Sequence, residues 1–166
     1  MAIIREATLD DAQALIAFVK RNENEPNLLA EPGVFNFTVE QEREFLQRFA
    51  DAENSVFLVA EHDRQIVGTL GCSGATHRTK KHIVSIGIAV HPDYRRQGIG
   101  AALIKSAIEW AQSTLSVRRM ELSVFARNQA AIRLYERFGF EIEGRHRQAY
   151  CKNGEFIDSF TMALIL

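Results

Sequence analysis

An apolar run over residues 84–90 leads into the segment Arg95-Arg96-Gln97-Gly98-Ile99-Gly100-Ala101, and this succession limits the folds open to the chain. The run predicts a buried strand, and the amphipathic stretch from about Gly98 to Ser113 predicts a helix. The first turn of a helix carries N–H groups without internal partners, and the helix dipole adds partial positive charge there. Glycine lets a ligand approach the backbone closely, and arginine adds full positive charge. The succession therefore predicts either a binding site for a diphosphate or a glycine-rich turn that binds no ligand.

The rest of the chain predicts short elements in a fixed order. Strands are expected over residues 2–6, 56–61, 65–70, 82–90, 120–125, 140–150 and 155–164, and helices after Thr8, after Thr38, over 98–113 and after Asn128. The order β-α-α-β-β-β-α-β-α-β-β predicts an α/β domain of the α+β type, with a mixed, mainly antiparallel sheet of about seven strands and about four helices. Three successive strands before the glycine turn exclude a doubly wound nucleotide fold.

Composition adds several expectations. With 166 residues the chain is expected to form one domain over 1–166, and a net charge of −1 gives no basic field for nucleic acid or an acidic membrane. Cys72 and Cys151 lie far apart and lack metal-type spacing, so neither a metal site nor a disulfide framework is expected. The N-terminus does not resemble a signal peptide, and no apolar run is long enough to span a bilayer. A cytoplasmic protein is therefore expected.

Three segments together resemble the GNAT superfamily of acyl-CoA-dependent N-acetyltransferases. They are the strand 82–90, the turn 95–101 and the block Asn128-Gln129-Ala130-Ala131-Ile132-Arg133-Leu134-Tyr135-Glu136-Arg137-Phe138-Gly139-Phe140. Arg95, Gly98 and Gly100 fill the phosphate motif of that family, and the order of elements fits along nearly the whole chain. The stretch 143–158 resembles a bacterial branch with ribosomal-protein and amino-acid acetyltransferases.

The resemblance implies an enzyme that uses acetyl-CoA as cosubstrate and no metal. A primary amine of a small molecule, an amino acid or a protein N-terminus would attack the thioester directly in a ternary complex. Two other classes stay open, a non-catalytic acyl-CoA sensor and an interaction domain that uses only the fold. A homodimer is possible.

The resemblance also implies where the cofactor lies. The strand 82–90 would carry a bulge and splay from the strand 120–125, so that the pantetheine arm takes backbone hydrogen bonds from Ile88, Ala89 and Val90. The amide of Ile88 would polarise the thioester carbonyl as an oxyanion donor. The diphosphate would lie on the basic glycine turn formed by Arg95, Arg96, Gln97, Gly98, Ile99, Gly100 and Ala101.

Proton transfer needs an acid and a base. Tyr135 is the candidate acid for the leaving thiolate, and its other interpretation is a packing aromatic. Asn128 either caps its helix or also contacts the pantetheine arm. Many relatives have a glutamate on the strand before the bulge, and here Ser85 stands at that position. His82 and Glu31 are the candidate bases, and the other interpretation of each is a solvated loop or edge residue.

Overall fold

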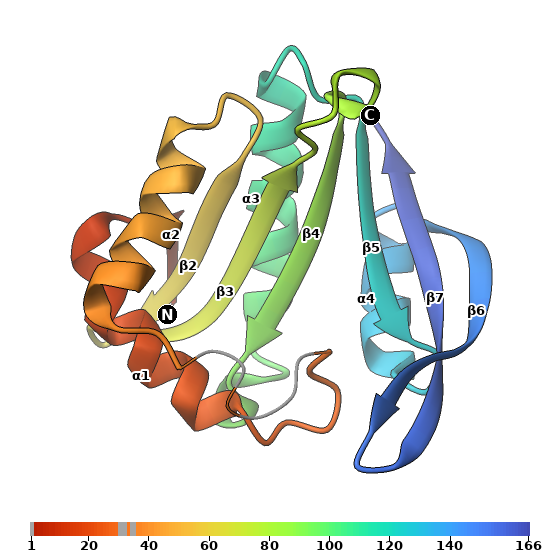
Figure 1. Ribbon diagram of the computed structural model, residues 1–166, viewed down its shortest axis with the longest axis horizontal. Helices are drawn as coiled ribbons and strands as arrows, with labels where there is room; N and C mark the ends of the chain where they lie inside the picture. Colours follow the sequence, from red (N-terminus) through yellow and green to blue (C-terminus); the bar gives the residue numbers. More distant parts are fainter. Residues whose placement is uncertain (1, 30–32, 34–35) are drawn as a thin grey trace.

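The computed structural model describes residues 2–29, 33 and 36–166. Its strands form one sheet in the order β1-β2-β3-β4-β5-β7-β6 (Figure 1). The strands are β1 Ile3–Glu6, β2 Val56–His62, β3 Gln65–Gly74, β4 Ile83–Val90, β5 Arg119–Phe125, β6 Glu141–Lys152 and β7 Glu155–Ile165. Strands β4 and β5 pair in parallel, and the other neighbours pair antiparallel. The expected mixed, mainly antiparallel sheet is confirmed.

Four α-helices cover the two faces of the sheet, as expected. Helices α1 Ala12–Asn22 and α2 Val39–Asp51 lie over β2 and β3 on one face, called here the α2 face (Figure 1). Helices α3 Ile99–Ser113 and α4 Gln129–Arg137 lie on the opposite α3 face, where most of the buried apolar side chains gather. The α2 face of β5, β7 and β6 carries no helix (Figure 1). This uneven cover leaves the middle of the sheet accessible from the α2 face.

Short sequence signals set the element boundaries. The Thr38 hydroxyl accepts a hydrogen bond from the amide of Gln41, whose side-chain oxygen accepts in return from the Thr38 amide, so the expected capping box is confirmed. The Asn128 side-chain oxygen accepts from the amide of Ala131 and caps α4. Gly139 ends α4 with φ of 86°, the expected left-handed conformation.

Three expectations need correction. The expected bulge in β4 is wrong, because the register with β3 runs without a shift from Gly68↔Val90 to Gly74↔Val84. Strand β3 continues to Gly74, since this unbroken ladder holds it four residues beyond its expected end at Leu70. The first helix after Thr8 opens with a 3₁₀ turn, Leu9–Asp11, because the Thr8 amide donates to the Asp11 carboxylate at 2.7 Å and tightens that turn.

Within the described residues, no helix combines the length and the apolar character needed to cross a membrane.

Candidate active site

The centre of the sheet is split between β4 and β5. These strands pair only over three positions, from Ile83↔Arg119 to Ser85↔Glu121, and then diverge (Figure 1). The split therefore arises without a bulge. Beyond Ser85, the edge of β4 that faces β5 has no strand partner, whereas its other edge stays paired with β3 as far as Val90.

The pairing with β3 determines which main-chain groups of β4 face the split. The amide of Ala75 donates to the carbonyl of Ile83 at 3.1 Å, and the amide of His91 donates to the carbonyl of Val67 at 2.9 Å. Because hydrogen-bonded pairs alternate in an antiparallel ladder, the odd-numbered residues of β4 face β3. The N–H and C=O groups of Ile88 and Val90 therefore face the split, whereas those of Ala89 face Thr69 of β3.

The amides at the start of α3 form a cradle, defined here as residues 96–101. Gly98 is the N-cap with φ of 80°, and the first intrahelical bond runs from the Ala102 amide to the Gly98 carbonyl, so the amides of Ile99, Gly100 and Ala101 have no partner within the helix. A Cβ built on Gly98 would meet nothing within 4 Å. Arg96 also has a positive φ, 60°. The cradle is thus an open set of main-chain donors at the positive end of a helix dipole.

Helix α4 closes the α3 side of the same region. A Cβ on Gly100 would lie 3.3 Å from a methyl of Leu134, and next to side-chain atoms of Val90 and Ile88 at 3.9 and 4.0 Å. The glycine therefore permits α4 to approach the start of α3 and the end of β4. Tyr135, the next residue of α4, belongs to the cluster of buried side chains on the same α3 face of the sheet.

Tyr135 is buried, with 6% of its surface exposed, and its ring packs on Phe140 at 5.8 Å between centroids. Burial raises the pKa of Tyr135 to about 12, because the phenolate would lose its hydration. Among the described residues, the hydroxyl has no hydrogen-bond partner. A buried phenol of this kind is protonated at neutral pH and can donate a hydrogen bond to a ligand.

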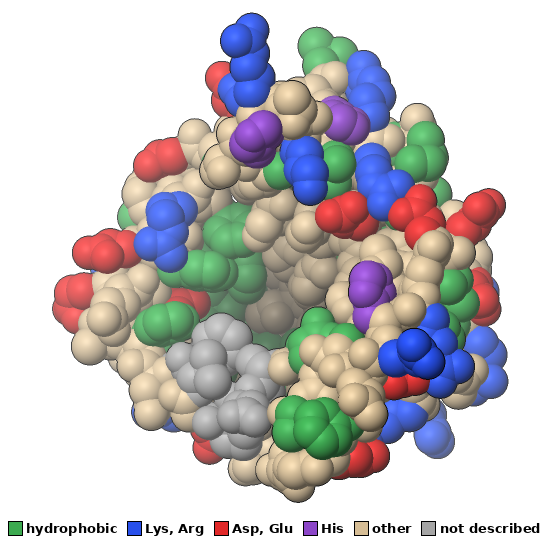
Figure 2. All heavy atoms as spheres, turned by 45° about the vertical axis from the view of Figure 1, so that its right-hand side comes forward, with side chains coloured by type: hydrophobic (Ala, Val, Ile, Leu, Met, Phe, Trp, Pro, Cys, Tyr) green, Lys and Arg blue, Asp and Glu red, His purple; other side chains and the backbone are tan. Residues whose placement is uncertain are grey.

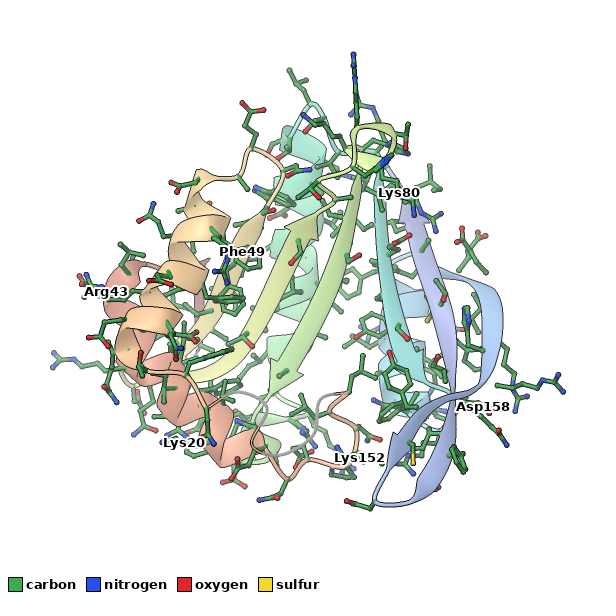
Figure 3. All side chains as sticks on the ribbon, in the orientation of Figure 1. Lys20, Arg43, Phe49, Lys80, Lys152 and Asp158 are labelled. Atoms are coloured by element: carbon green, nitrogen blue, oxygen red, sulfur yellow. The ribbon has the colours of Figure 1, made fainter. Side chains whose placement is uncertain are left out.

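The segment 23–29, which follows α1, is bound both to the turn before α3 and to strand β6. Arg95 donates from Nη2 to Glu25 at 2.6 Å and from Nε to the Val90 carbonyl at 3.0 Å. The buried Lys152 of β6 donates to the carbonyls of Glu25 and Leu28, each at 2.9 Å, and Figure 3 shows it beside this segment. Arg95, expected to bind phosphate, thus engages protein groups in this structure. A phosphate contact by Arg95 would have to share or replace the bond to Glu25.

Lys152→Met should lower the free energy of unfolding by about 1–3 kcal/mol, because two carbonyls of segment 23–29 would lose a charged donor. Lys105→Met is the control, since Lys105 is 71% exposed and forms only a long pair with Glu109 at 3.8 Å. Urea unfolding of both variants measures the difference. Equal stability of the two variants would contradict the anchoring role of Lys152.

The α2 face carries a hollow next to the split. Figure 2 shows hydrophobic side chains along one wall and charged side chains along the rim. Phe57 packs edge to face against Phe45 and Phe49, which are tilted by 60° to each other, and the ring centroids are 5.0–5.4 Å apart. The ring of Phe57 lies over Gly71, where a Cβ would come within 3.2 Å, and Figure 3 shows Phe49 reaching from α2 toward the sheet. The glycine therefore makes room for the aromatic wall.

Polar residues are cross-strand neighbours on β3, β4 and β5 at the apex of the split, where β4 and β5 still pair. Ser73 pairs with Ser85, and Ser85 pairs with Glu121. Both neighbours of Ser85 along β4, Val84 and Ile86, are buried on the α3 face, so the Ser85 side chain points to the α2 face. A cavity of about 480 Å³ adjoins Ser73 at this end of the sheet, and Arg48 and Lys81 also line it.

The candidate bases from the sequence are not brought together. His82 is exposed just before β4, and its carbonyl accepts from the amides of Arg118 and Arg119. Glu31 lies outside the described residues. Sequence reasoning missed Glu121, which stands beside Ser85 on the next strand. Its only sequence signal was its position in the alternating strand 120–125, and that position did not reveal its neighbour.

The two cysteines of the chain lie in different environments. Cys72 is fully buried, and burial raises the pKa of its thiol to about 12. Cys151 is exposed on the edge strand β6, and strands β4, β5 and β7 separate it from Cys72 on β3. A protonated thiol is a poor nucleophile, so the site does not favour transfer through an acyl-cysteine.

The split, the amide cradle and the order of elements define an acyl-CoA N-acyltransferase fold. The model of the Acetyltransferase (GNAT) family matches residues 21–140. The chain belongs to this family, and it is an N-acetyltransferase.

Relatives of known name support the assignment. The L-amino acid N-acetyltransferase AaaT of Escherichia coli K12 is 35% identical over 119 residues, which are 72% of this chain and 74% of AaaT. The ribosomal protein bS18-alanine N-acetyltransferase of the same organism is 42% identical over 77 residues, 46% of this chain and 51% of that enzyme.

Solved structures agree with the fold. A GNAT-family acetyltransferase from Streptococcus pneumoniae has a TM-score of 0.96 and 33% identity, with 100% of each chain covered. The yncA protein of Salmonella typhimurium, solved with its cofactor acetyl-CoA, has a TM-score of 0.88 at 20% identity and covers 100% of this chain and 94% of its own.

Proposed function

We propose that residues 1–166 form a single catalytic domain that transfers the acetyl group of acetyl-CoA directly to a primary amine. The observation that carries this proposal is the split between β4 and β5, which leads from the exposed main chain of Ile88 and Val90 to the amide cradle. A pantetheine arm has alternating amide groups that can pair with such an edge, and a diphosphate suits a helix N-terminus. Acetyl-CoA is also the cofactor in the yncA structure.

The cofactor would lie with its diphosphate on the amides of Arg96, Gln97, Gly98, Ile99, Gly100 and Ala101. Ile88 would pair with the pantetheine arm, and Val90 would offer its N–H, since its carbonyl accepts a hydrogen bond from Arg95. Ala89 would flank the arm. Asn128, which already caps α4, would contact the arm with its free amide hydrogens. The main-chain N–H of Ile88 points into the split and would stabilise the oxyanion, an effect typically of about 2.7–4 kcal/mol per donor.

Tyr135 would be the hydrogen-bond and proton donor to the leaving thiolate. Since its pKa is about 12, the phenol keeps its proton over the whole neutral range. A free thiol has a pKa of about 8.5, so full transfer from this phenol to a hydrated thiolate would be uphill. Desolvation in a closed site raises the pKa of the thiolate as well, which brings the two groups closer in basicity. Tyr135 therefore first stabilises the thiolate by a hydrogen bond and then shares its proton.

The acceptor would enter from the α2 face, opposite the helices that flank the cofactor. Its amine could belong to an amino acid, as the name of AaaT states for that enzyme, to a protein N-terminus, as in the bS18 enzyme, or to another small molecule. The aromatic wall and the rim of the hollow would select among these amines. His82 and Glu31 stay as candidate bases from the sequence.

Acetyl-CoA should raise the apparent stability of the protein by about 2.7 kcal/mol at 100 times its Kd, because it binds only the native state. A thermal-shift titration measures this effect, and release of free thiol with a panel of amines, with product masses, measures transfer. A shift without amine-dependent thiol release would indicate a sensor instead of an enzyme. The absence of both would contradict the proposal.

A further inference from the structure

We propose that Glu121 is a catalytic residue that binds the ammonium of the acceptor and accepts its proton; this inference rests on the proposed function. Ser85↔Glu121 is the last pair before β4 and β5 separate, so Glu121 stands at the apex of the split. The position on β4 where the resemblance implied a glutamate holds Ser85, and the neighbouring strand brings a carboxylate to its side. A carboxylate that can accept a proton is thus available from β5 in place of β4.

The side chain of Glu121 points to the face from which an acceptor can reach the split. Its neighbours Met120 and Leu122 are buried on the α3 face, so the alternation of the strand turns Glu121 to the α2 face. Its side chain is 33% exposed. The residue therefore meets solvent on the α2 face, opposite the helices that flank the cofactor region.

Glu121 keeps one oxygen for a ligand. Oε2 accepts a hydrogen bond from Arg119 Nε at 3.1 Å, and Oε1 has no hydrogen-bond partner in the part of the chain that the structure describes. Arg119 donates from its two terminal nitrogens to the carboxylate of Glu143 on β6, and these hydrogen bonds hold the pKa of Arg119 above its usual range. The guanidinium thus fixes the rotamer of Glu121 and shares its charge between two carboxylates.

The charges around Glu121 favour a cation. The facing groups are Arg119 on its own strand and Glu143, bound to Arg119, on β6. The residues beside Glu121 on β4 and β7, Ser85 and Ala163, are uncharged. Two carboxylates and one guanidinium leave a net negative charge, which attracts an ammonium and disfavours an acceptor whose reacting end is anionic.

The proton balance is complete with these groups. The ammonium gives one proton to Glu121 Oε1, and the freed lone pair forms the C–N bond at the thioester carbon. As the C–S bond breaks, the sulfur leaves with its electron pair and takes a proton from Tyr135. The new amide nitrogen then loses its second proton, and this proton restores the phenol of Tyr135. Glu121 then releases its proton to solvent, so each turnover yields one amide, one thiol and one proton.

Glu121→Gln should lower kcat/KM by about 100-fold near pH 7, a typical effect of losing a general base. The loss should shrink to about tenfold or less near pH 9.5, because α-amines with a pKa of about 7.7–8.0 are then already neutral. The affinity for acetyl-CoA should stay unchanged. Glu141 is an exposed carboxylate on β6 that pairs with Ala163, the residue that Glu121 pairs with on β7. The Glu141→Gln variant is therefore the control, and it should keep kcat/KM within about twofold of the unaltered protein.

The decisive measurements separate this inference from the proposed function. If the unaltered protein binds acetyl-CoA and acetylates an amine but Glu121→Gln is as active at pH 7, or loses the same factor at both pH values, Glu121 is not the base. If the unaltered protein neither binds acetyl-CoA nor releases thiol, the proposed function itself fails. Should Glu121→Gln not fold, Glu121→Asp gives the same test, since its shortened carboxylate should lose about tenfold at pH 7 and recover at high pH.

Discussion

Acetyl-CoA is expected to bind the Gly98→Asp variant about 30-fold to 1,000-fold more weakly than the Gly98→Asn variant. The Cβ of either residue would be free of clashes, because a Cβ on Gly98 meets nothing within 4 Å, and both residues tolerate the φ of 80° better than other non-glycine residues do. Only aspartate places a negative charge beside the amides that would hold the diphosphate. Two like charges about 4 Å apart at an effective dielectric constant of about 20 repel by about 4 kcal/mol, and solvent screening reduces this value.

Isothermal titration with coenzyme A at fixed ionic strength measures that ratio, and raised salt should diminish it. The asparagine variant controls for the strain of a side chain at a positive φ, so the stability of the two variants should agree. Equal affinity of both variants for coenzyme A would contradict the binding of the diphosphate at residues 96–101. Arg96→Gly offers a complementary change, since it relieves the positive φ of 60° while removing a cation from the same turn.

The fold was largely predictable because its signals are local. Apolar alternation marked the strands, Thr38 and Asn128 marked helix starts, and Gly139 marked a helix end; each signal acts within a few residues. The boundaries that were wrong lie where tertiary pairing decides. Residues 71–74 have a polar, glycine-containing sequence, yet the ladder with β4 extends β3 through them.

The site was predictable only in part, because its key relationships join distant segments. The turn at Arg95, Gly98 and Gly100 could be found from spacing, but the bond of Arg95 to Glu25 joins residues 70 positions apart. Likewise, the pairing of Ser85 with Glu121 depends on the register of a parallel pair. Side-chain alternation fixes which face each residue occupies, but a slip of two residues would leave that alternation unchanged. The split itself was expected for the wrong reason, since β4 keeps a regular ladder with β3 and simply leaves β5 after three pairs.

Tyr135→Phe is expected to lower kcat by about 100-fold or more while leaving the affinity for acetyl-CoA within about twofold, because the hydroxyl contributes only when the thiolate forms. The pKa of about 12 fixes the pH signature: Tyr135 is in its acid form below that value, so it should cause no fall of kcat between about pH 7 and pH 10. The raised pKa of Tyr135 also makes the stability of the folded protein depend on pH. The unfolded tyrosine loses its proton near its ordinary value of 10, so the raised pKa makes the protein lose stability as the pH rises from about 10 toward 12, and the phenylalanine variant should lack that loss.

Tyr94→Phe is the matched control for Tyr135→Phe. Tyr94 is half-buried beside His91, with ring centroids 5.8 Å apart, and it lies on the strand-to-helix turn and not on α4. Its hydroxyl has no assigned part in the transfer, so turnover should stay within about twofold of the unaltered protein. Single-turnover thiol release at saturating acetyl-CoA measures the chemical step for both variants, separate from product release. If Tyr135→Phe releases thiol as fast as Tyr94→Phe does, the thiolate leaves without a proton from α4, and the buried phenol serves only to pack against Phe140.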